Sequence, residues 1–503
     1  MTPTPPSLAR RALMALVLMI GFYALAAVII VALLWLPYAE ARYLHHLNGR
    51  LVLFALVGAG GIIAGIVPRI DRFPDPGPRL TPEQQPRLFA VLAPLARATG
   101  QPVPMRVFLV QEMNAWVAER GGVLGIGSHR VMGIGLPLLE LLTVAELRAV
   151  LAHEFGHFHG GDTSLGPWLY KTRAGIGRTI RSLPDQHSWI RAPFLWYGNL
   201  FLRVTHAASR QQEYAADALA AKVAGSDALA SGLKKLHAFG PLVHFFWDQE
   251  IAPPLMHGLL PPVGAGIARL VGSPRTIDEA QRLLARALTE SASDPYDTHP
   301  ALKDRLDALP TSAAVEETTA RAVTLLDDPD HLDRVLLESV LTADAVRSLR
   351  PVSWEEMATA FWIPIWEAMV RGSQAQLAGL TPAGCAAFAG HPAAPAVRWQ
   401  LVSDEAHAPE AHVDVGVARL GATLSVLLHH RGWRIHMLPG EELVFSSDGR
   451  EIRPYNLLSG LLLERLPAAA WEEQWRAIGL ADEDLGALAA SLPVPARDSA
   501  VAG

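Results

Sequence analysis

Cysteine is almost absent from this chain of 503 residues, in which Cys385 is the one cysteine. A single thiol excludes an intramolecular disulfide framework and also a zinc site built from several cysteines. Any bound metal must therefore depend on histidine and carboxylate ligands. Charge is scarce as well, because 18% of the residues are charged, against about 25% in ordinary soluble proteins.

An excess of positive charge is also missing, since the formal net charge is −6. A slightly acidic chain offers no general electrostatic footprint for nucleic acid, so we expect no nucleic-acid partner. The hydrophobic share of 50% excludes a disordered chain. At about 100 to 200 residues per domain, the length predicts two or three domains. The shortage of charge predicts that one region is unusually apolar.

Two long uncharged runs near the N-terminus supply that region. No charged residue occurs from Ala12 to Ala39, and a second uncharged run extends from Leu51 to Pro68. The first run exceeds the roughly 20 residues that cross a bilayer, and the second is just long enough. A short polar loop separates them. Residues 1–68 are therefore predicted to form a transmembrane helical hairpin in the lipid bilayer.

Two further features of this hairpin bear on its packing and orientation. Gly61 and Gly65 have the G-x-x-x-G spacing, which allows close backbone approach, here expected against the first helix. Arginines flank both outer ends of the hairpin, so the positive-inside rule places both ends in the cytoplasm. A cleaved signal peptide and a buried hairpin in a soluble protein are the alternatives, although a signal core has only about 7 to 15 apolar residues.

The rest of the chain is predicted to be mainly α with a small β-sheet, an α+β fold. A proline-rich linker at 69–80 precedes a mixed region at 81–349. The apolar run Pro193–Val204 is too short to span a bilayer and is interpreted as a core or interfacial helix. Three short β-like runs predict the sheet, and they are Met105–Val110, Met113–Val117 and Arg130–Gly135.

The pattern of apolar and aromatic residues changes near residue 350. An aromatic helical pattern at Trp354–Met369 is followed by alternating runs at Val397–Ser403, Ala422–His429 and Trp433–Phe445. We therefore predict a separate C-terminal α+β domain at 350–503, and its role cannot be inferred from its residues.

An H-E-x-x-H motif lies on a predicted helix whose start is marked by Thr143 and Glu146, a capping box. Because positions i and i+4 share one helix face, His153 and His157 can hold one Zn²⁺. Glu154 then lies beside the water that such a zinc binds, where it can act as a base. The alternative is a helix whose two histidines are partly buried and bind nothing.

A catalytic zinc needs a third protein ligand and an open fourth position. Glu213 and Asp217 are spaced i, i+4 on a later predicted helix. Glu213 can be the third ligand, while Asp217 can accept a hydrogen bond from the distal nitrogen of His153 and fix its tautomer. A solvated acidic face is the alternative, and the small apolar residues that flank this pair argue against it.

Four motifs in this order resemble the HtpX-like membrane metallopeptidases, which are related to the type I CAAX prenyl endopeptidases. The resemblance implies a zincin-like metalloprotease domain of the gluzincin type, with one Zn²⁺ held by His153, His157 and Glu213 and with Glu154 as general base. It covers roughly residues 80–310 through H-E-x-x-H, the S-R-x-x-E-x-x-A-D block at Ser209–Asp217, the segment Met113–Trp116, and Thr298–Pro300 followed by Arg305.

The resemblance also implies that a strand at Asn114 and Ala115 pairs with an extended substrate backbone, and that His299 and Arg305 approach the metal. Either of the latter two could stabilise the oxyanion, or His299 could occupy the fourth zinc position and hold the enzyme latent. HtpX-like proteins commonly have a further pair of hydrophobic helices between the two zinc motifs. Here the interval 171–181 carries four basic residues instead.

The sequence therefore predicts a zinc endopeptidase of the bacterial inner membrane, with its catalytic domain facing the cytoplasm. Its expected substrates are membrane-associated or misfolded polypeptides. The competing hypothesis is a membrane-anchored binding or chaperone-like protein with a structural or latent zinc site. Glu154 distinguishes the two, because a structural site has no need of a general base. Prenyl-protein processing fits less well, since two spans are too few to enclose a lipidated peptide.

Overall fold

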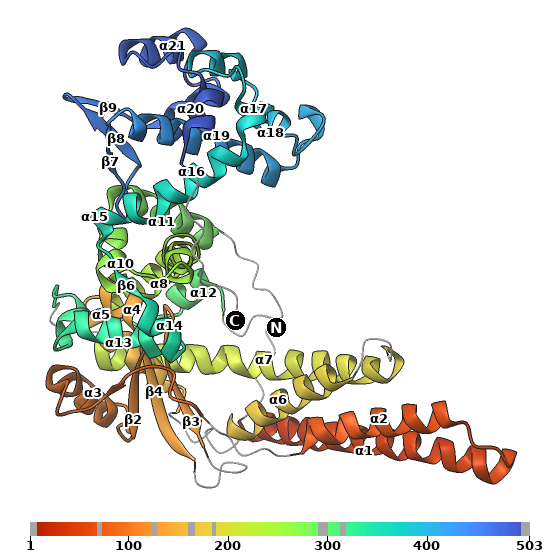
Figure 1. Cartoon of the computed structure of the whole chain (residues 1–503). Coiled ribbons are helices and arrows are strands. Elements are labelled where there is room, and N and C mark those ends of the chain that lie inside the picture. Colours follow the sequence, from red (N-terminus) through yellow and green to blue (C-terminus); the bar gives the residue numbers. More distant parts are fainter. Residues whose placement is uncertain are drawn as a thin grey trace. The chain divides into compact units, whose positions relative to one another are not determined.

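The computed structural model of the protein describes residues 8–67, 73–121, 128–158, 166–183, 188–289, 300–311, 318–339 and 341–493 (Figure 1). Contacts divide the chain into two compact units. The first comprises Met1–His244 with Asp278–Thr342, and the second comprises Phe245–Ile277 with Ala343–Gly503. Both units are mainly helical and each contains small sheets of two to four strands, which confirms the predicted fold class.

The two apolar N-terminal helices predicted from the sequence are present as α1 (Leu8–Leu44) and α2 (Gly49–Ile66). The segment Leu16–Leu44 of α1 and all of α2 are long and apolar enough to cross a membrane, with mean hydropathies of 2.9 and 1.9. A third helix of that length, α19 (Glu410–His430), has 56% of its most apolar window buried in the second unit. Its apolar surface is therefore used largely as protein core.

Two more helices pack along α1 and α2, namely α6 (Gly166–Ser182) and the first part of α7 (Ser188–Ala224) (Figure 1). The Tyr197 hydroxyl donates a hydrogen bond to the carbonyl oxygen of Leu18 at 2.5 Å. The segment Pro193–Val204, interpreted as a core or interfacial helix, is thus the part of α7 that packs on α1. Buried side chains from all four helices form one cluster, which includes Phe22, Leu33, Ile62, Ile176, Leu183, Phe194 and Phe201.

The G-x-x-x-G face of α2 contacts α6 and not α1. A Cβ atom added to Gly65 would lie 2.7 Å from Thr179 Cα, and one added to Gly61 would lie 3.1 Å from the carbonyl oxygen of Ser182. The Ser182 hydroxyl also donates to the carbonyl oxygen of Gly61 at 2.8 Å. The expected packing of this face against the first helix is therefore wrong. The spacing predicts a close approach but does not specify the partner.

The first unit contains a four-stranded sheet of order β1-β2-β4-β3. β4 pairs in parallel with β2 and antiparallel with β3, so β3 lies at one edge of the sheet. All three predicted strand runs overlap a strand, and the predicted linker ends in the short strand β1. The strands are β1 (Arg79–Leu80), β2 (Arg106–Val110), β3 (Ala115–Arg120) and β4 (His129–Gly135).

The H-E-x-x-H segment lies in α5 (Val144–Gly156). The predicted capping box starts this helix, because Thr143 Oγ1 accepts from the Glu146 amide at 3.3 Å and Glu146 Oε2 accepts from the Thr143 amide at 2.8 Å. α5 packs against α7 on one side and near β3 on another. The remaining helices that lie wholly or mostly in this unit are α3 (Pro86–Ala98), α4 (Leu136–Leu141), α8 (Ser226–Phe246), α11 (Pro274–Thr289), α12 (Leu302–Asp307), η4 (Ala322–Leu325) and α13 (Pro329–Ser339).

Residues 245–277 fold with the C-terminal unit, although the sequence analysis assigned them to the region 81–349. Trp354 Nε1 donates to the carbonyl oxygen of Pro262 at 2.9 Å, and Ser273 Oγ donates to that of Gly440 at 2.5 Å. These bonds and a parallel strand pair link the segments. The elements of the segment 245–277 are η3 (Trp247–Ile251), α9 (Ala252–Met256), β5 (Leu259–Leu260) and α10 (Val263–Gly272), and β5 pairs with β6 (Arg350–Pro351).

The core of the second unit surrounds α19, and a three-stranded meander flanks it. Two alternating runs interpreted as strands are helical or irregular, because Ala422–His429 lies in α19 and Val397–Ser403 overlaps the end of α18. Every residue from Leu420 to Leu428 is buried, so this part of α19 is enclosed by protein and has no solvent-exposed face. The elements are α14 (Ala343–Ser348), α15 (Trp354–Met357), η5 (Ala358–Trp362), α16 (Ile363–Gly372), α17 (Gln374–Leu377), η6 (Ala383–Phe388), α18 (Ala394–Arg398), η7 (Glu405–His407), β7 (Arg434–His436), β8 (Val444–Ser447), β9 (Arg450–Ile452), α20 (Pro454–Leu462), α21 (Ala468–Ala477) and α22 (Leu485–Ser491).

Candidate metal centre and active site

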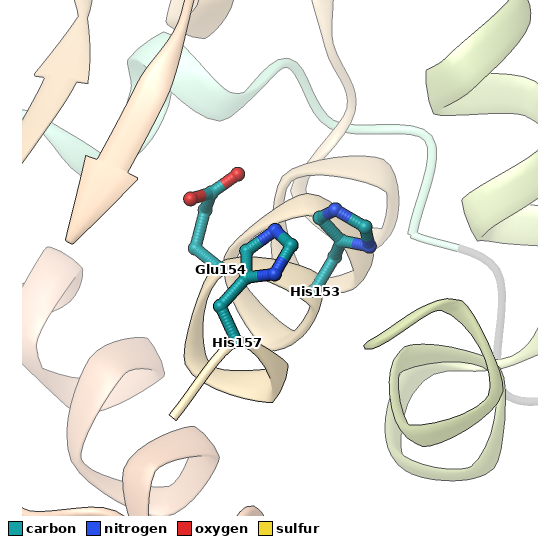
Figure 2. Close-up of side chains that lie close together, drawn as sticks. All are labelled: His153, Glu154 and His157. Carbon is teal, nitrogen blue, oxygen red and sulfur yellow. The ribbon is translucent and has the colours of Figure 1, made fainter. Parts of the chain in front are cut away.

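Three polar side chains converge at the C-terminal end of α5. His153 and His157 project from the same face of the helix, with ring centroids 4.7 Å apart (Figure 2). Potential ligand atoms of these two histidines and of Glu154 all lie within 4.8 Å of one another. The spacing in the sequence therefore produces the juxtaposition expected of an H-E-x-x-H helix.

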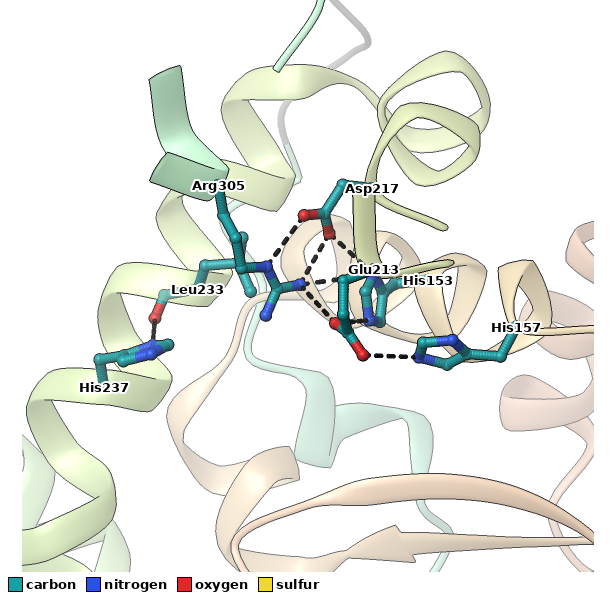
Figure 3. A network of polar contacts seen from close by, with 7 residues as sticks. All are labelled: His153, His157, Glu213, Asp217, Leu233, His237 and Arg305. Atoms are coloured by element: carbon teal, nitrogen blue, oxygen red, sulfur yellow. Dashed lines mark hydrogen bonds and ion pairs between the residues drawn. The ribbon is translucent and has the colours of Figure 1, made fainter. Parts of the chain in front are cut away.

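A second carboxylate reaches the same histidines from α7. Glu213 Oε2 lies 3.4 Å from His153 Nε2, and Glu213 Oε1 lies 3.6 Å from His157 Nε2 (Figure 3). The α5 and α7 backbones approach closely here, since a Cβ on Gly156 would lie 2.8 Å from Ala216 Cα. Two imidazoles and a carboxylate are the donors that zinc takes in catalytic sites, so these three residues could hold that metal.

Asp217 lies one helical turn after Glu213 and contacts the other side of the first histidine. Its Oδ1 is 2.8 Å from His153 Nδ1. Arg305 of α12 donates to the same carboxylate from Nε at 2.9 Å and from a terminal nitrogen at 2.7 Å. Glu213 and Asp217 are only 3% and 2% exposed, which excludes the solvated acidic face considered for this pair.

These contacts shift the protonation of the buried groups. Burial alone would lower the pKa of His153, but its bonds to Asp217 and Glu213 outweigh burial and raise that pKa to about 9. Burial alone would raise the pKa of Asp217, but hydrogen bonds from Arg305 and His153 lower it to about 2. Without a metal, the cluster is therefore an ion pair of a protonated histidine with carboxylates.

Glu154 titrates differently. Burial raises the pKa of its carboxyl to about 7, and the charge on Glu213 adds to this effect. Its side chain lines a cavity of about 220 Å³, together with His153, His157 and Arg305. A carboxyl group with a pKa near neutrality can both accept and donate a proton at physiological pH.

The predicted substrate strand borders the same cavity. Asn114, Ala115 and Trp116 line it, and Ala115 is the first residue of β3. On its inner side β3 pairs with β4, and in the part of the chain that the structure describes no strand pairs with its outer side. An unpaired strand edge beside a polar cavity can bind an extended peptide by adding a strand.

Of the last two predicted site residues, Arg305 and His299, the structure describes only Arg305. Arg305 lies within the cluster, where its guanidinium pairs with Asp217 and also approaches Glu213 Oε2 at 3.7 Å. His299 lies outside the described residues, so its expected approach to the metal stays a prediction.

Comparison with known proteins identifies relatives of the part of the chain that contains this site. Residues 82–313 match the model of peptidase family M48. This part of the chain is therefore similar to the M48 peptidases. Proteins named "Protease HtpX homolog" are similar to it: the one from Persephonella marina is 29% identical over 236 residues, covering 41% of this chain and 76% of that protein. The one from Paraburkholderia phytofirmans is 27% identical over 221 residues, covering 41% and 75%. No solved structure matches the chain.

The resemblance to HtpX-like peptidases is therefore confirmed, whereas the kinship with CAAX endopeptidases stays a prediction. Within the region that matches the M48 model, three residues of the cavity wall were not predicted from the sequence. They are Leu229, Leu233 and Leu236 of α8. The leucines follow a helical spacing that is typical of any core-facing helix, so nothing in the sequence distinguished them from ordinary core residues.

Proposed function

We propose that this M48 protein is a zinc endopeptidase that cleaves membrane-associated or misfolded polypeptides at the cytoplasmic face of the bacterial inner membrane. The observation that carries the proposal is the convergence of His153, His157 and Glu213 beside Glu154. The cavity there borders β3, whose outer edge pairs with no strand within the described residues. The names of the similar proteins, HtpX protease homologues, agree with this activity.

The zinc would be held by His153, His157 and Glu213. Zinc supplies Lewis acidity, which lowers the pKa of water and polarises a scissile carbonyl. Asp217 accepts the Nδ1 proton of His153 and so turns Nε2 toward the ligand position. Arg305 holds Asp217 in this orientation through two hydrogen bonds. In this proposal Arg305 acts as a positioning residue, and the oxyanion role of His299 or Arg305 stays a prediction.

Glu154 is proposed to move the proton. As a carboxylate it takes a proton from the water that attacks the carbonyl carbon, and as an acid it returns that proton to the leaving amine. The substrate backbone would add to the outer edge of β3 at Asn114 and Ala115, which presents the scissile bond to the cavity. The helices α1 and α2 would anchor the chain, with both of their outer ends in the cytoplasm.

A single substitution tests the proposal. We expect the full chain with Glu154→Gln, purified in detergent, to retain one zinc per chain and to lose cleavage of an unfolded protein substrate. Glu83→Gln, an exposed position outside the cavity, is the matched control and should cleave at the wild-type rate. Cleavage by the Glu154→Gln protein at the wild-type rate would sink the mechanism and favour the binding-protein hypothesis.

A further inference from the structure

The helix α8 is hydrogen-bonded to the first turn of α5, the helix that carries the H-E-x-x-H motif. Glu146, which caps α5, accepts hydrogen bonds from Ser231 Oγ at 2.5 Å and from Lys235 Nζ at 2.7 Å. Burial would raise the pKa of Glu146, but these bonds lower it, so the carboxylate stays charged. The position of α8 relative to α5 is therefore fixed by a charged, hydrogen-bonded link.

At Gly232, α8 lies close to α5 between these two bonds. A Cβ on Gly232 would lie 3.4 Å from Val150 Cγ2, an ordinary van der Waals distance, so α8 packs directly on α5 at this position and an alanine would also fit. Val150 is one turn before the first histidine of the motif and lines the cavity. The two helices thus contact each other beside the cavity.

Three leucines of α8 form an apolar side of this cavity. Leu229, Leu233 and Leu236 are spaced i, i+4 and i+7, so they share one helix face, and all three line the cavity with His153 and Glu154. Leu229 and Leu233 are buried, whereas Leu236 is partly exposed. Because Ser231 and Lys235 bond α8 to Glu146 of α5, the leucine face is held beside the catalytic groups.

On the basis of the proposed function, we propose that α8 determines specificity: the leucine face receives an apolar side chain, of the size of leucine or phenylalanine, from one residue flanking the scissile bond. The substrates would then be segments that present an apolar side chain on an extended backbone, as unfolded or membrane-derived segments do. A carboxylate side chain at that position is disfavoured, since it would be desolvated by the leucines beside Glu154.

Binding to an inactive protein tests this inference without turnover. The full chain with Glu154→Gln, loaded with zinc in detergent, is titrated with fluorescent peptides that differ only at one position flanking the scissile bond. We expect a leucine peptide to bind about tenfold to a hundredfold more tightly than the alanine peptide. An aspartate peptide should bind more weakly than either. Equal affinities for all three, or no binding of any, would overturn the inference.

Variants of the leucine face separate specificity from folding. Leu236→Trp in the same background fills the cavity from a partly exposed position and should reduce the leucine-to-alanine affinity ratio to near one. Leu233→Ala should shift the preference toward a larger side chain such as phenylalanine. Leu242→Ala lies on the same helix but outside the cavity lining and is the matched control, for which the ratio should not change.

The changes in affinity distinguish a role of the leucines in specificity from a purely structural role. If the leucines had only a structural role, Leu233→Ala and Leu236→Trp would weaken all peptides by the same factor and leave the ratio unchanged, which would contradict the inference. The proposed function fails in a different way, namely if the zinc-loaded wild type cleaves none of these peptides while the binding preference persists.

Discussion

The two units of this protein differ in what their cores contain. Among the residues that the structure describes, every buried charged side chain lies in the first unit, and the group comprises Glu140, Glu146, His153, Glu213, Asp217, Arg305 and Asp333. In the described part of the second unit, the buried polar side chains carry hydroxyl groups, and they are Ser273, Thr276, Ser373, Thr423 and Ser425. Its core is built from large apolar residues such as Trp471 and Trp475.

The difference indicates where the chemistry of the molecule resides. Hydroxyl groups are easily satisfied inside a helix, as when Ser425 Oγ donates to the carbonyl oxygen of Gly421 at 2.8 Å. A buried charge costs several kcal/mol of desolvation unless it is paired, and even a paired ion is rarely better for stability than an apolar residue. The paired cluster of His153, Glu213, Asp217 and Arg305 is therefore best explained by function, whereas the apolar core of the second unit is explained by stability.

Removal of one member of the charged cluster should have the largest effect. Arg305→Leu removes one of the two cations that pair with the buried carboxylates of Asp217 and Glu213, the other being protonated His153. We therefore expect a loss of about 3–5 kcal/mol in the free energy of unfolding of the metal-free chain. Arg453→Leu breaks an exposed pair with Glu442 and Glu451 in the second unit and should cost less than about 1 kcal/mol. Chemical denaturation measures both. Similar losses of unfolding free energy for the two variants would contradict the difference described between the two units.

A cavity in the apolar core should act on the second unit only. Leu458 of α20 is fully buried, so Leu458→Ala should cost about 2–5 kcal/mol. Hydrogen exchange should show faster opening of α19 and α20, with unchanged protection of α5. The kcat for a short peptide should be the same as in the wild type. Loss of protection in α5 of the same size would show that the two cores do not open separately.

Glu140 gives the pH dependence expected of a buried charge that has no catalytic role. Burial raises its pKa to about 7 from 4.5, although Arg321 opposes the shift. The folded state therefore keeps a proton that the unfolded state releases, and stability falls as the pH rises from about 4.5 to 7. Glu140→Gln should be more stable than the wild type by about 1–3 kcal/mol at pH 8.

At pH 4.5 the Glu140→Gln and wild-type proteins should be equally stable, because the carboxyl is then largely protonated in the folded state and close to half protonated in the unfolded state. Thermal denaturation at both pH values gives the test. A stability difference that does not change with pH would show that this carboxyl does not titrate as described.

The smallest effect concerns the apolar helices. Gly65→Ala places a Cβ within 3 Å of Thr179 backbone atoms, so we expect a loss of about 1–3 kcal/mol. Gly60→Ala has nothing within 4 Å of its Cβ and should be neutral or slightly stabilising, since alanine favours the helix. Thermal unfolding in detergent compares them. Equal behaviour of the two variants would mean that α6 does not pack on this face.

Short sequence patterns that dictate their own geometry predict the structure correctly. The i, i+4 histidines, the Thr143 capping box and the two apolar runs each dictate a local arrangement, and each is present. Local patterns do not identify a packing partner that is distant in sequence. Gly61 and Gly65 indicate close packing but not the identity of α6, and the α8 leucines have the spacing of an ordinary core face.

The C-terminal unit was harder to predict for a different reason. A helix buried on all sides shows no 3.6-residue period, so the apolar run at Ala422–His429 could not be distinguished from a strand. The assignment of 245–277 to the second unit depends on tertiary bonds, such as that from Trp354 to Pro262, which no local pattern reveals.

The central claim is that Glu213 binds the metal and Glu154 does not, although both carboxylates lie close to the two histidines. Zinc K-edge X-ray absorption of the full chain tests it most directly. We predict two imidazole nitrogens and carboxylate oxygen around zinc in the wild type, an identical coordination shell in Glu154→Gln, and loss of the carboxylate oxygen in Glu213→Ala. A shell that changes in Glu154→Gln and persists in Glu213→Ala would contradict this assignment.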